Sequence, residues 1–120
     1  SEQRKDLLSS SSIARRLEKL SQKVMPGMDK SLLTKKDWQA IFSLVDSIYP
    51  SFSTQIAAYD LTLAESHYCY LVLFHFDAIA EARLLNILPD SVNKRRQRVR
   101  QKLGITGKEV DLYTYLIHLA

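Results

Sequence analysis

The chain has 120 residues, 46% of them hydrophobic and 25% charged, which is the composition of a globular domain with a hydrophobic core. Its single cysteine, Cys69, excludes internal disulfides and indicates a reducing compartment, so we expect a cytoplasmic protein. No apolar run approaches the roughly 20 residues of a membrane span and no signal peptide is visible, so we expect no membrane contact by this chain. Because it begins at Ser1 without a methionine, we expect it to be part of a longer protein.

The net charge of +4 conceals an uneven distribution. Residues 1–37 carry nine basic and five acidic groups (net +4), residues 38–92 carry one and six (net −5), and residues 93–120 carry seven and two (net +5). Local clusters of cations indicate an anionic partner better than a high isoelectric point does. Only three glycines and three prolines interrupt the chain, which favours an all-α fold, a helical bundle.

Residues 6–24 are predicted to form a helix, because Ile13, Leu17, Leu20 and Val24 follow one another at intervals of four, three and four. The opposite face is charged and comprises Arg15, Arg16, Glu18, Lys19 and Lys23. Two interpretations stay open from this pattern. The helix packs onto its own domain, or it is the end of a coiled coil that pairs two protomers or joins an upstream module.

Pro26 and Gly27 end that helix, and residues 25–33 form a connector. Thr34 and Asp37 have the spacing of a capping box, which predicts that a helix begins there. Its inward stripe comprises Trp38, Ile41, Phe42, Val45, Ile48 and Tyr49. A short helix with Phe52, Ile56 and Tyr59 on its inner side is predicted at residues 51–59.

Two further helices are predicted before the basic segment. Thr62 and Glu65 form a capping box for a helix that runs to about residue 75 and buries Cys69 in the core. Asp77 can cap the next helix, over residues 78–85.

The most basic stretch of the chain is predicted to be a helix from Pro89 to Leu103, with Gly104 as its left-handed C-terminal residue. Val92, Val99 and Leu103 lie on one side, which leaves a strongly basic outer surface. Such a helix can lie against a phosphate backbone with its tip in a groove.

The sequence also predicts a closing helix after that basic segment. Thr106 and Glu109 resemble another capping box, which would begin the last helix. Its expected inward residues are Val110, Leu112 or Tyr113, Leu116 and Ile117.

Three patterns in the second half, in this order and at this spacing, resemble the LuxR/GerE-type helix-turn-helix domain. They are Leu61-Thr62-x-x-Glu65, then Ala82-x-x-Leu85-x-Ile87-x-x-x-Ser91-Val92, then Val99-x-x-Lys102-Leu103-Gly104-Ile105. Upstream, Trp38 and the Tyr49-Pro50-x-Phe52 step are similar to a version found at the C-terminus of Bacteroidetes-type regulators, after tetratricopeptide or sensor modules.

The resemblance implies a four-helix, winged-helix-like domain in residues 61–120. Residues 1–33 would be an added amphipathic helix with its connector, and residues 34–60 a helical extension that packs on the domain. It further implies that residues 77–86 form a scaffold helix and residues 89–103 a recognition helix in the major groove of double-stranded DNA. The implied function is that of a sequence-specific DNA-binding effector domain of a transcriptional regulator in signal transduction, acting as a dimer.

The expected DNA-binding residues on this helix are Ser91, Asn93, Lys94, Gln97, Arg98, Arg100, Gln101 and Lys102. Those in the N-terminal half, Asn93, Lys94 and Gln97, are expected to approach base edges, whereas the later cations contact phosphate. Arg95 and Arg96 lie nearer the buried side, where internal ion pairing is at least as strong an expectation.

The chain departs from the family pattern at three positions. Members of the family carry Gly where His75 stands, an aliphatic residue where Glu81 stands, and a capping Ser or Thr where Leu88 stands. A charge at the second of these positions must find a partner, for which an arginine is a candidate, or the helix must rotate to expose it. Leu88 cannot cap the basic helix with its side chain.

An alternative function is a protein-interaction or dimerisation module that keeps this fold without specific DNA binding. A homodimer would then form through the residue 6–24 helix or the C-terminal helix. An enzyme is not expected, because the three histidines and Cys69 show neither metal-ligand spacing nor a nucleophile with its base, and no cofactor motif is present.

Overall fold

The computed structural model describes residues 2–23 and 31–120, and within these ranges every regular element is an α-helix, as predicted. The helices are α1 (Glu2–Ser9), α2 (Ser12–Ser21), α3 (Lys35–Ile48), α4 (Phe52–Ala57), α5 (Leu63–Val72), α6 (Ala78–Leu85), α7 (Pro89–Lys102) and α8 (Leu112–Leu119). The expected stop at Pro26 and Gly27, and the seam residue Val24, lie outside the described ranges.

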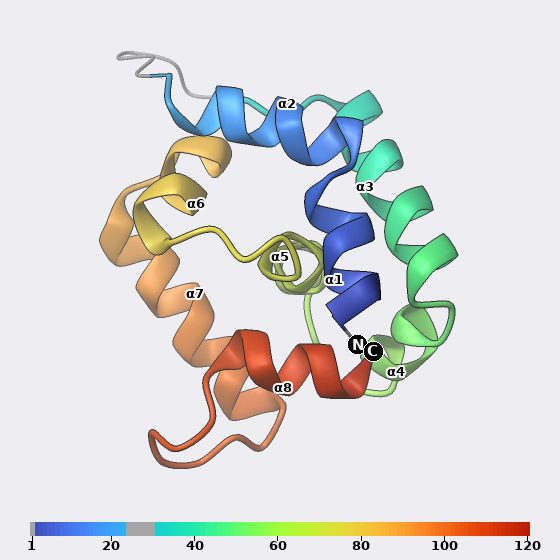
Figure 1. The fold of residues 1–120 in the computed structure, drawn as a ribbon. Coiled ribbons are helices and arrows are strands. Elements are labelled where there is room, and N and C mark those ends of the chain that lie inside the picture. The colour runs from blue at the N-terminus through green and yellow to red at the C-terminus, as the bar shows by residue number, and fades with distance from the viewer. Residues whose placement is uncertain (1, 24–30) are drawn as a thin grey trace.

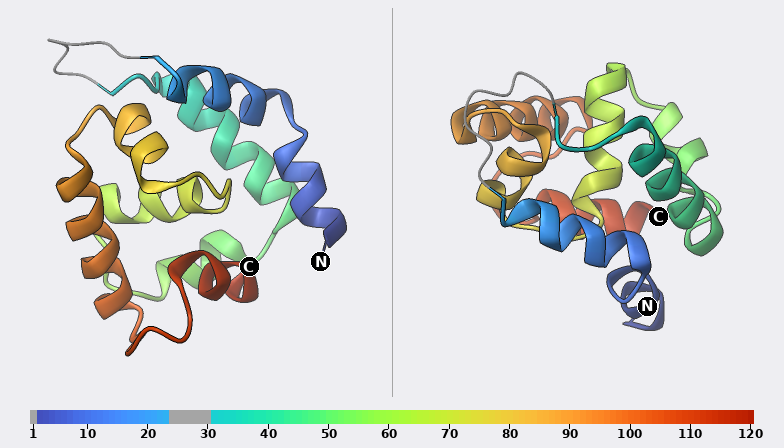
Figure 2. Two further views of the ribbon diagram at one scale, coloured as in Figure 1. Left: turned by 60° about the vertical axis from the view of Figure 1, so that its left-hand side comes forward. Right: turned by 90° about the horizontal axis from the view of Figure 1, so that it is seen from above.

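Helix α5 lies at the centre of the molecule, and the other helices surround it (Figure 1). Its second half is buried from Tyr68 to Val72, including the predicted core cysteine Cys69. A helix that is apolar around its whole circumference is stable only when it is covered on all sides. The two further views in Figure 2 show α7 along one edge of the molecule, with α1 and α3 on the opposite side.

The N-terminal region forms two helices, so the prediction of one helix over residues 6–24 is wrong. The helix is interrupted at Ser10 and Ser11. The Ser11 side chain accepts a hydrogen bond from the backbone N–H of Ala14 and so caps α2. The predicted stripe of α2 is buried in the chain's own core, with Leu17 fully covered. This stripe is therefore not available for a coiled coil with a second copy.

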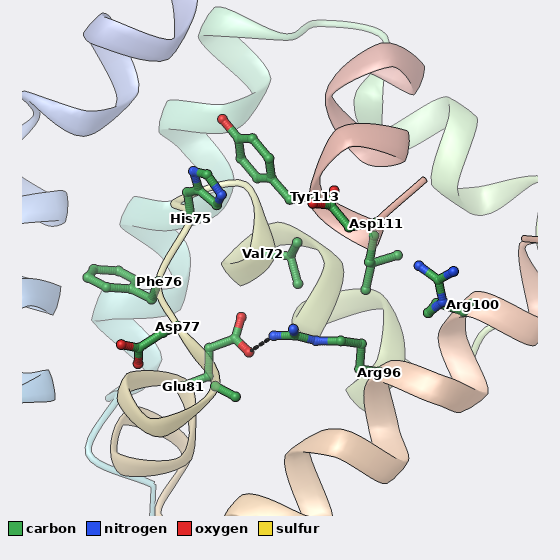
Figure 3. Close-up of a pocket in the computed structure, with 11 residues that line it drawn as sticks. Val72, His75, Phe76, Asp77, Glu81, Arg96, Arg100, Asp111 and Tyr113 are labelled. Carbon is green, nitrogen blue, oxygen red and sulfur yellow. Dashed lines mark hydrogen bonds and ion pairs between the residues drawn. The ribbon is translucent and has the colours of Figure 1, made fainter. Parts of the chain in front are cut away.

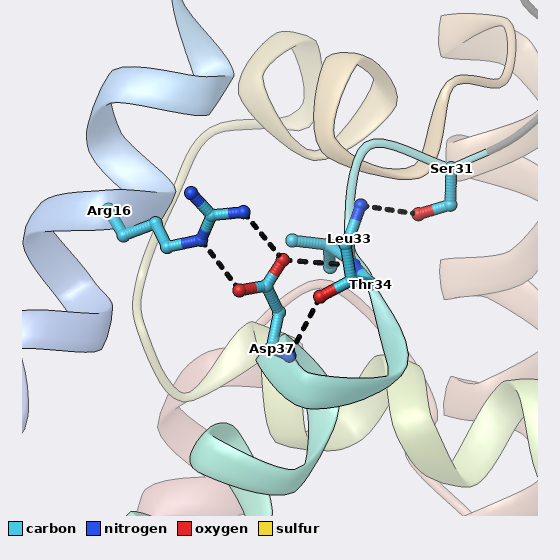
Figure 4. Close-up of polar contacts among 5 residues, drawn as sticks. All are labelled: Arg16, Ser31, Leu33, Thr34 and Asp37. Carbon is cyan, nitrogen blue, oxygen red and sulfur yellow. Dashed lines mark hydrogen bonds and ion pairs between the residues drawn. The ribbon is translucent and has the colours of Figure 1, made fainter.

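Caps at the predicted positions begin three of the helices. Thr34 and Asp37 form both bonds of a capping box at the start of α3 (Figure 4), and Thr62 and Glu65 do the same for α5. Asp77 caps α6 through the N–H of Ala80. Side-chain oxygens satisfy backbone donors that would otherwise lack partners at each helix start.

One hydrophobic core joins the three predicted parts of the chain. It includes Leu8 and Leu17 from the first part, Phe52 from the second, and Tyr68 and Leu116 from the third. Residues 34–60 supply the predicted stripe of α3, of which Ile41 and Val45 are fully buried. The N-terminal helices thus support the second half of the chain directly.

The last helix begins later than its sequence predicts. Residues 106–109 do not cap a helix; the cap is Asp111, whose side chain accepts the N–H of Thr114. Val110, expected to point inward, is 40% exposed, whereas Leu112 and Leu116 are buried as expected. Gly107 has a positive φ of 77°, which suits a turn and interrupts a helix at that position.

Candidate nucleic-acid interface

A three-residue turn, residues 86–88, joins α6 to α7. Asn86 adopts the left-handed conformation (φ 53°, ψ 49°), and the N–H of Ile87 donates to the carbonyl of Ala82 at 3.0 Å. This is the hydrogen-bond pattern of a Schellman motif, and asparagine tolerates the left-handed conformation better than most residues. The turn therefore ends α6 sharply and sets the direction of α7.

The predicted limits and anchoring side of the basic helix are confirmed. Helix α7 has Pro89 in its first turn and is followed by Gly104 with φ 78°. Val92 and Val99 are fully buried, and α7 packs against α6. Leu88 provides no side-chain cap, as expected, and is 72% exposed.

The outer face of α7 carries polar side chains that face solvent. Asn93, Lys94, Gln97 and Gln101 are exposed, as is Ser91 in the first turn. No hydrogen bond or ion pair to another described residue is found for the first four side chains. Their donors and acceptors are therefore free to meet a ligand.

Arg96 points into the protein and holds the buried carboxylate of Glu81. Its Nη2 donates to Glu81 Oε1 at 2.6 Å, and the hydroxyl of Tyr68 donates to the same oxygen at 2.8 Å. Figure 3 shows the two charged side chains directed toward each other. Glu81 is 1% exposed, so the prediction that this carboxylate needs an arginine partner is confirmed.

Burial raises the pKa of Glu81, and it outweighs the opposing attraction of Arg96 and the hydrogen bond from Tyr68. Burial likewise raises the pKa of the Tyr68 hydroxyl, which stays protonated and can donate. The three side chains form a polar cluster that joins α5, α6 and α7.

Glu65 contacts two of the cations expected to face phosphate. Lys102 Nζ donates to its Oε1 at 2.6 Å, and Arg98 Nε lies 3.9 Å from its Oε2. Burial raises the pKa of Glu65, but the hydrogen bonds from Lys102 and the Thr62 N–H outweigh it and leave that pKa lowered. Glu65 is therefore ionised at neutral pH, and it partly neutralises this flank of α7.

Arg100 fastens the segment between α7 and α8. Its Nη1 donates to the carbonyl of Val110 and its Nη2 to that of Gly107, both at 2.8 Å. Hydrogen bonds from an ionised donor are stronger than neutral ones. The Arg100 guanidinium therefore stabilises the segment before α8. Its positive charge is not neutralised, because both partners are carbonyl groups.

His75, which ends the turn after α5, occupies a backbone conformation that favours glycine. Its φ is 63°, and its ring stacks on that of Tyr113 with centroids 3.6 Å apart and planes 6° from parallel. The stack joins the start of α8 to the segment between α5 and α6. A side chain in this conformation costs roughly 1–2 kcal/mol, which the stack partly offsets.

A pocket of about 310 Å³ lies between this stack and the Glu81–Arg96 pair (Figure 3). Burial raises the pKa of Cys69 to about 12, so its thiol stays protonated, as a core cysteine does. Within residues 2–23 and 31–120, no group of three or more His, Cys, Asp or Glu side chains could hold a metal ion. Over the same ranges, no helix has the length and apolar character to span a membrane.

No protein-family model, curated protein or solved structure matches the chain. The resemblance to the LuxR/GerE-type domain therefore stays a prediction from the sequence patterns.

The sequence patterns missed the internal partners of the basic residues. Glu65 was expected to cap α5 only, yet it also binds cations 33 and 37 positions further along the chain. Arg98 is nevertheless exposed over 58% of its side chain, and Lys102 over 35%. Both keep surface that a phosphate can reach.

Proposed function

We propose that the chain is a DNA-binding effector domain of a transcriptional regulator, with α7 as the helix that enters the major groove. The observation that carries this proposal is the outer face of α7. Its polar side chains are exposed and have no partner in residues 2–23 and 31–120, while the opposite side of the helix is anchored on α6; they are Asn93, Lys94, Gln97 and Gln101. Amide and ammonium groups are the side chains that read base edges in the major groove.

The joint between α6 and α7 supports the proposal. Two helices connected by a three-residue turn, with the second helix exposed along its length, form the arrangement by which helix-turn-helix proteins present a recognition helix. Two departures from the family pattern also have a local compensation. His75 adopts a left-handed conformation, which glycine favours, and Glu81 is paired.

The proposed role of each side chain on α7 follows from its position along the helix and from its charge. Lys94 and Gln97 lie in the N-terminal and middle turns of the exposed face, where they can contact bases. Arg98 and Lys102 lie on the flank beside Glu65, where they contact phosphate and give affinity without sequence choice. Arg100 positions the segment before α8 and adds positive charge.

Selection of duplexes from a random pool, followed by titration at several salt concentrations, tests the proposal. We expect a selected sequence to bind more tightly than random duplex, with affinity falling steeply as salt rises. Lys94→Ala and Gln97→Ala should each cost about 1–3 kcal/mol on the selected sequence and little on random duplex.

The matched control is Lys5→Ala, which removes a half-buried lysine from α1, on the opposite side of the molecule from α7 (Figure 2). It should leave sequence preference unchanged. If no sequence is enriched and every duplex binds equally weakly, the proposal fails. A chain that self-associates and ignores DNA would instead support an interaction module of the same fold.

A further inference from the structure

One face of α2 is basic and exposed to solvent. Arg15, Lys19 and Lys23 follow at intervals of four, in and just after α2, and all three are exposed. None of the three side chains has an ion pair or hydrogen bond to another described residue. Four helical residues advance about 6 Å, so the three charges form a row along one side.

The neighbouring arginine of α2 is used differently. Arg16 binds Asp37 through two hydrogen bonds of 2.6 and 3.1 Å, which fix α2 to the start of α3 (Figure 4). This ion pair gives Arg16 a role in stabilising the fold. No such role is found for the three cations of the row in the described part of the chain. Exposed lysines with no partner contribute little to stability, so the row has no evident structural role.

The opposite side of α2 limits what the row can bind. Ile13, Leu17 and Leu20 are buried in the core, so α2 has no apolar face to insert into a lipid surface. Interfacial helices bind membranes through both an apolar and a basic face. A ligand that is recognised by charge alone, such as a phosphate backbone, fits the row better.

The position of α2 relates the row to the proposed DNA-binding helix. Helices α2 and α7 both pack against α6, and Arg83 of α6 donates to the carbonyl of Ser21 at 3.3 Å. Figures 1 and 2 show α6 between the C-terminal part of α2 and the start of α7. Arg83 is exposed, and its side chain has only this carbonyl as a partner in the part of the chain that the structure describes, so it adds a cation between the two helices.

We propose that the row Arg15–Lys19–Lys23 contacts the phosphate backbone of the same duplex that α7 binds, outside the base pairs that α7 reads. The inference rests on the proposed function of α7. A duplex that reaches both helices must extend past α6, so the row acts only on DNA longer than the segment in contact with α7. Its contribution is affinity without sequence choice, because phosphate contacts do not distinguish bases.

The test replaces the row by glutamines, Arg15→Gln, Lys19→Gln and Lys23→Gln together. Glutamine keeps the helix propensity of α2, and the buried stripe is unchanged. The slope of log affinity against log salt should become shallower by up to about 2.7 on a duplex of roughly 30 base pairs, three helical turns, because each lost phosphate contact changes it by about 0.9.

Four comparisons make the result specific. On a duplex of roughly 15 base pairs centred on the selected sequence, wild type and triple variant should bind alike. The ratio of affinities for selected and random duplexes should not change. Lys5→Gln, which removes from α1 a charge that is paired with Glu2, should leave the salt slope on the long duplex unaltered, whereas Lys19→Gln alone should reduce it by about 0.9.

The outcomes separate this inference from the proposed function. An unchanged salt slope for the triple variant, with Lys94→Ala still losing sequence preference, overturns the inference and leaves the function of α7 intact. Loss of sequence preference in the triple variant also overturns it. So does a triple variant that binds DNA like the wild type but has lost binding to anionic vesicles or to an acidic protein. A shallower slope confined to the long duplex supports it.

Discussion

The two basic helices on either side of α6 use their charges in opposite ways. On α7, Arg96 is paired with Glu81, and Arg98 and Lys102 share Glu65. On α2 and just after it, one arginine is paired, and a row of three cations has no partner among the described residues. The helix with more basic residues therefore has a smaller share of them without a carboxylate partner.

The comparison shows that a count of basic residues overestimates the charge available to a ligand. A carboxylate at 2.6 Å neutralises a cation locally, and it must be displaced before a phosphate can take its place. The uncommitted amides of α7 suit sequence recognition, whereas the unpaired cations of α2 suit general attraction. Three changes test this division of labour, from the largest expected effect to the smallest.

Arg96→Met should have the largest effect, because it leaves the buried Glu81 without its charged partner. We expect a loss of about 3 kcal/mol in the free energy of unfolding at pH 7, measured by urea denaturation. Burial then raises the pKa of Glu81 further, so the protonated carboxyl is favoured in the folded state. The variant should therefore gain stability as the pH falls from 7 toward 5 and lose it as the pH rises.

The double variant Arg96→Met, Glu81→Leu is the matched control for this pair. Removing both charges should restore most of the lost stability, because an apolar pair of similar size needs no desolvation of ions. A single variant that unfolds like the wild type at pH 7 would contradict the structural role given to Arg96.

Glu65→Gln should increase the affinity for DNA. Glutamine can keep the capping box with Thr62, but it no longer neutralises Lys102 and Arg98. Because Lys102 and Arg98 then meet phosphate without a competing carboxylate, affinity for random duplex should rise severalfold and the salt slope should steepen by up to about 1.8. Fluorescence anisotropy at several salt concentrations measures both quantities.

The increase for Glu65→Gln should be equal on selected and random duplexes, because phosphate contacts carry no sequence information. Stability should fall by no more than about 1 kcal/mol, the value of a partly exposed ion pair. Equal affinity of wild type and variant at low salt would show that Glu65 does not restrain this flank of α7.

Arg16→Gln should have the smallest effect, on stability alone. The hydrogen bond from Arg16 lowers the pKa of Asp37 from its usual 3.8, so the pair stabilises the fold above that pH and ceases to do so as Asp37 is protonated. We expect the variant to lose about 1 kcal/mol at pH 7, and the difference from wild type to shrink below pH 3.8.

Denaturation of both proteins at pH 7 and pH 3 measures this linkage. DNA binding should be unchanged in Arg16→Gln, because this arginine is outside the unpaired row. A difference that grows toward low pH would contradict the assignment of the linkage to Asp37.

Local sequence signals predicted where α5, α6 and α7 begin. Thr62, Asp77 and Pro89 mark helix starts because the groups that cap or begin a helix lie within a few residues of one another. The limits of α6 and the start of α7 coincide with the prediction. Those of α5 do not, since it ends at Val72 rather than near residue 75.

Two kinds of feature were not predicted from the sequence. They are helix starts at which two possible caps compete, and contacts between residues far apart in the chain. Ser11 provides a cap inside what reads as one continuous helix, and Asp111 provides a better start than the Thr106–Glu109 pattern. An arginine partner for Glu81 was expected, although Arg96 was not singled out for that role. The two cations that share Glu65 were not predicted. Their contact depends on how α5 and α7 pack, which periodicity along one helix does not encode.

Complete enclosure of Cys69 gives the protein a built-in reporter of its own opening. It is the only thiol in the chain, and it lies at the centre of α5 with no exposed surface. A thiol-specific reagent can reach it only when the helices around α5 separate, and the high pKa of the buried thiol prevents reaction in the closed state. The rate of labelling therefore measures how often the core opens, with and without bound DNA.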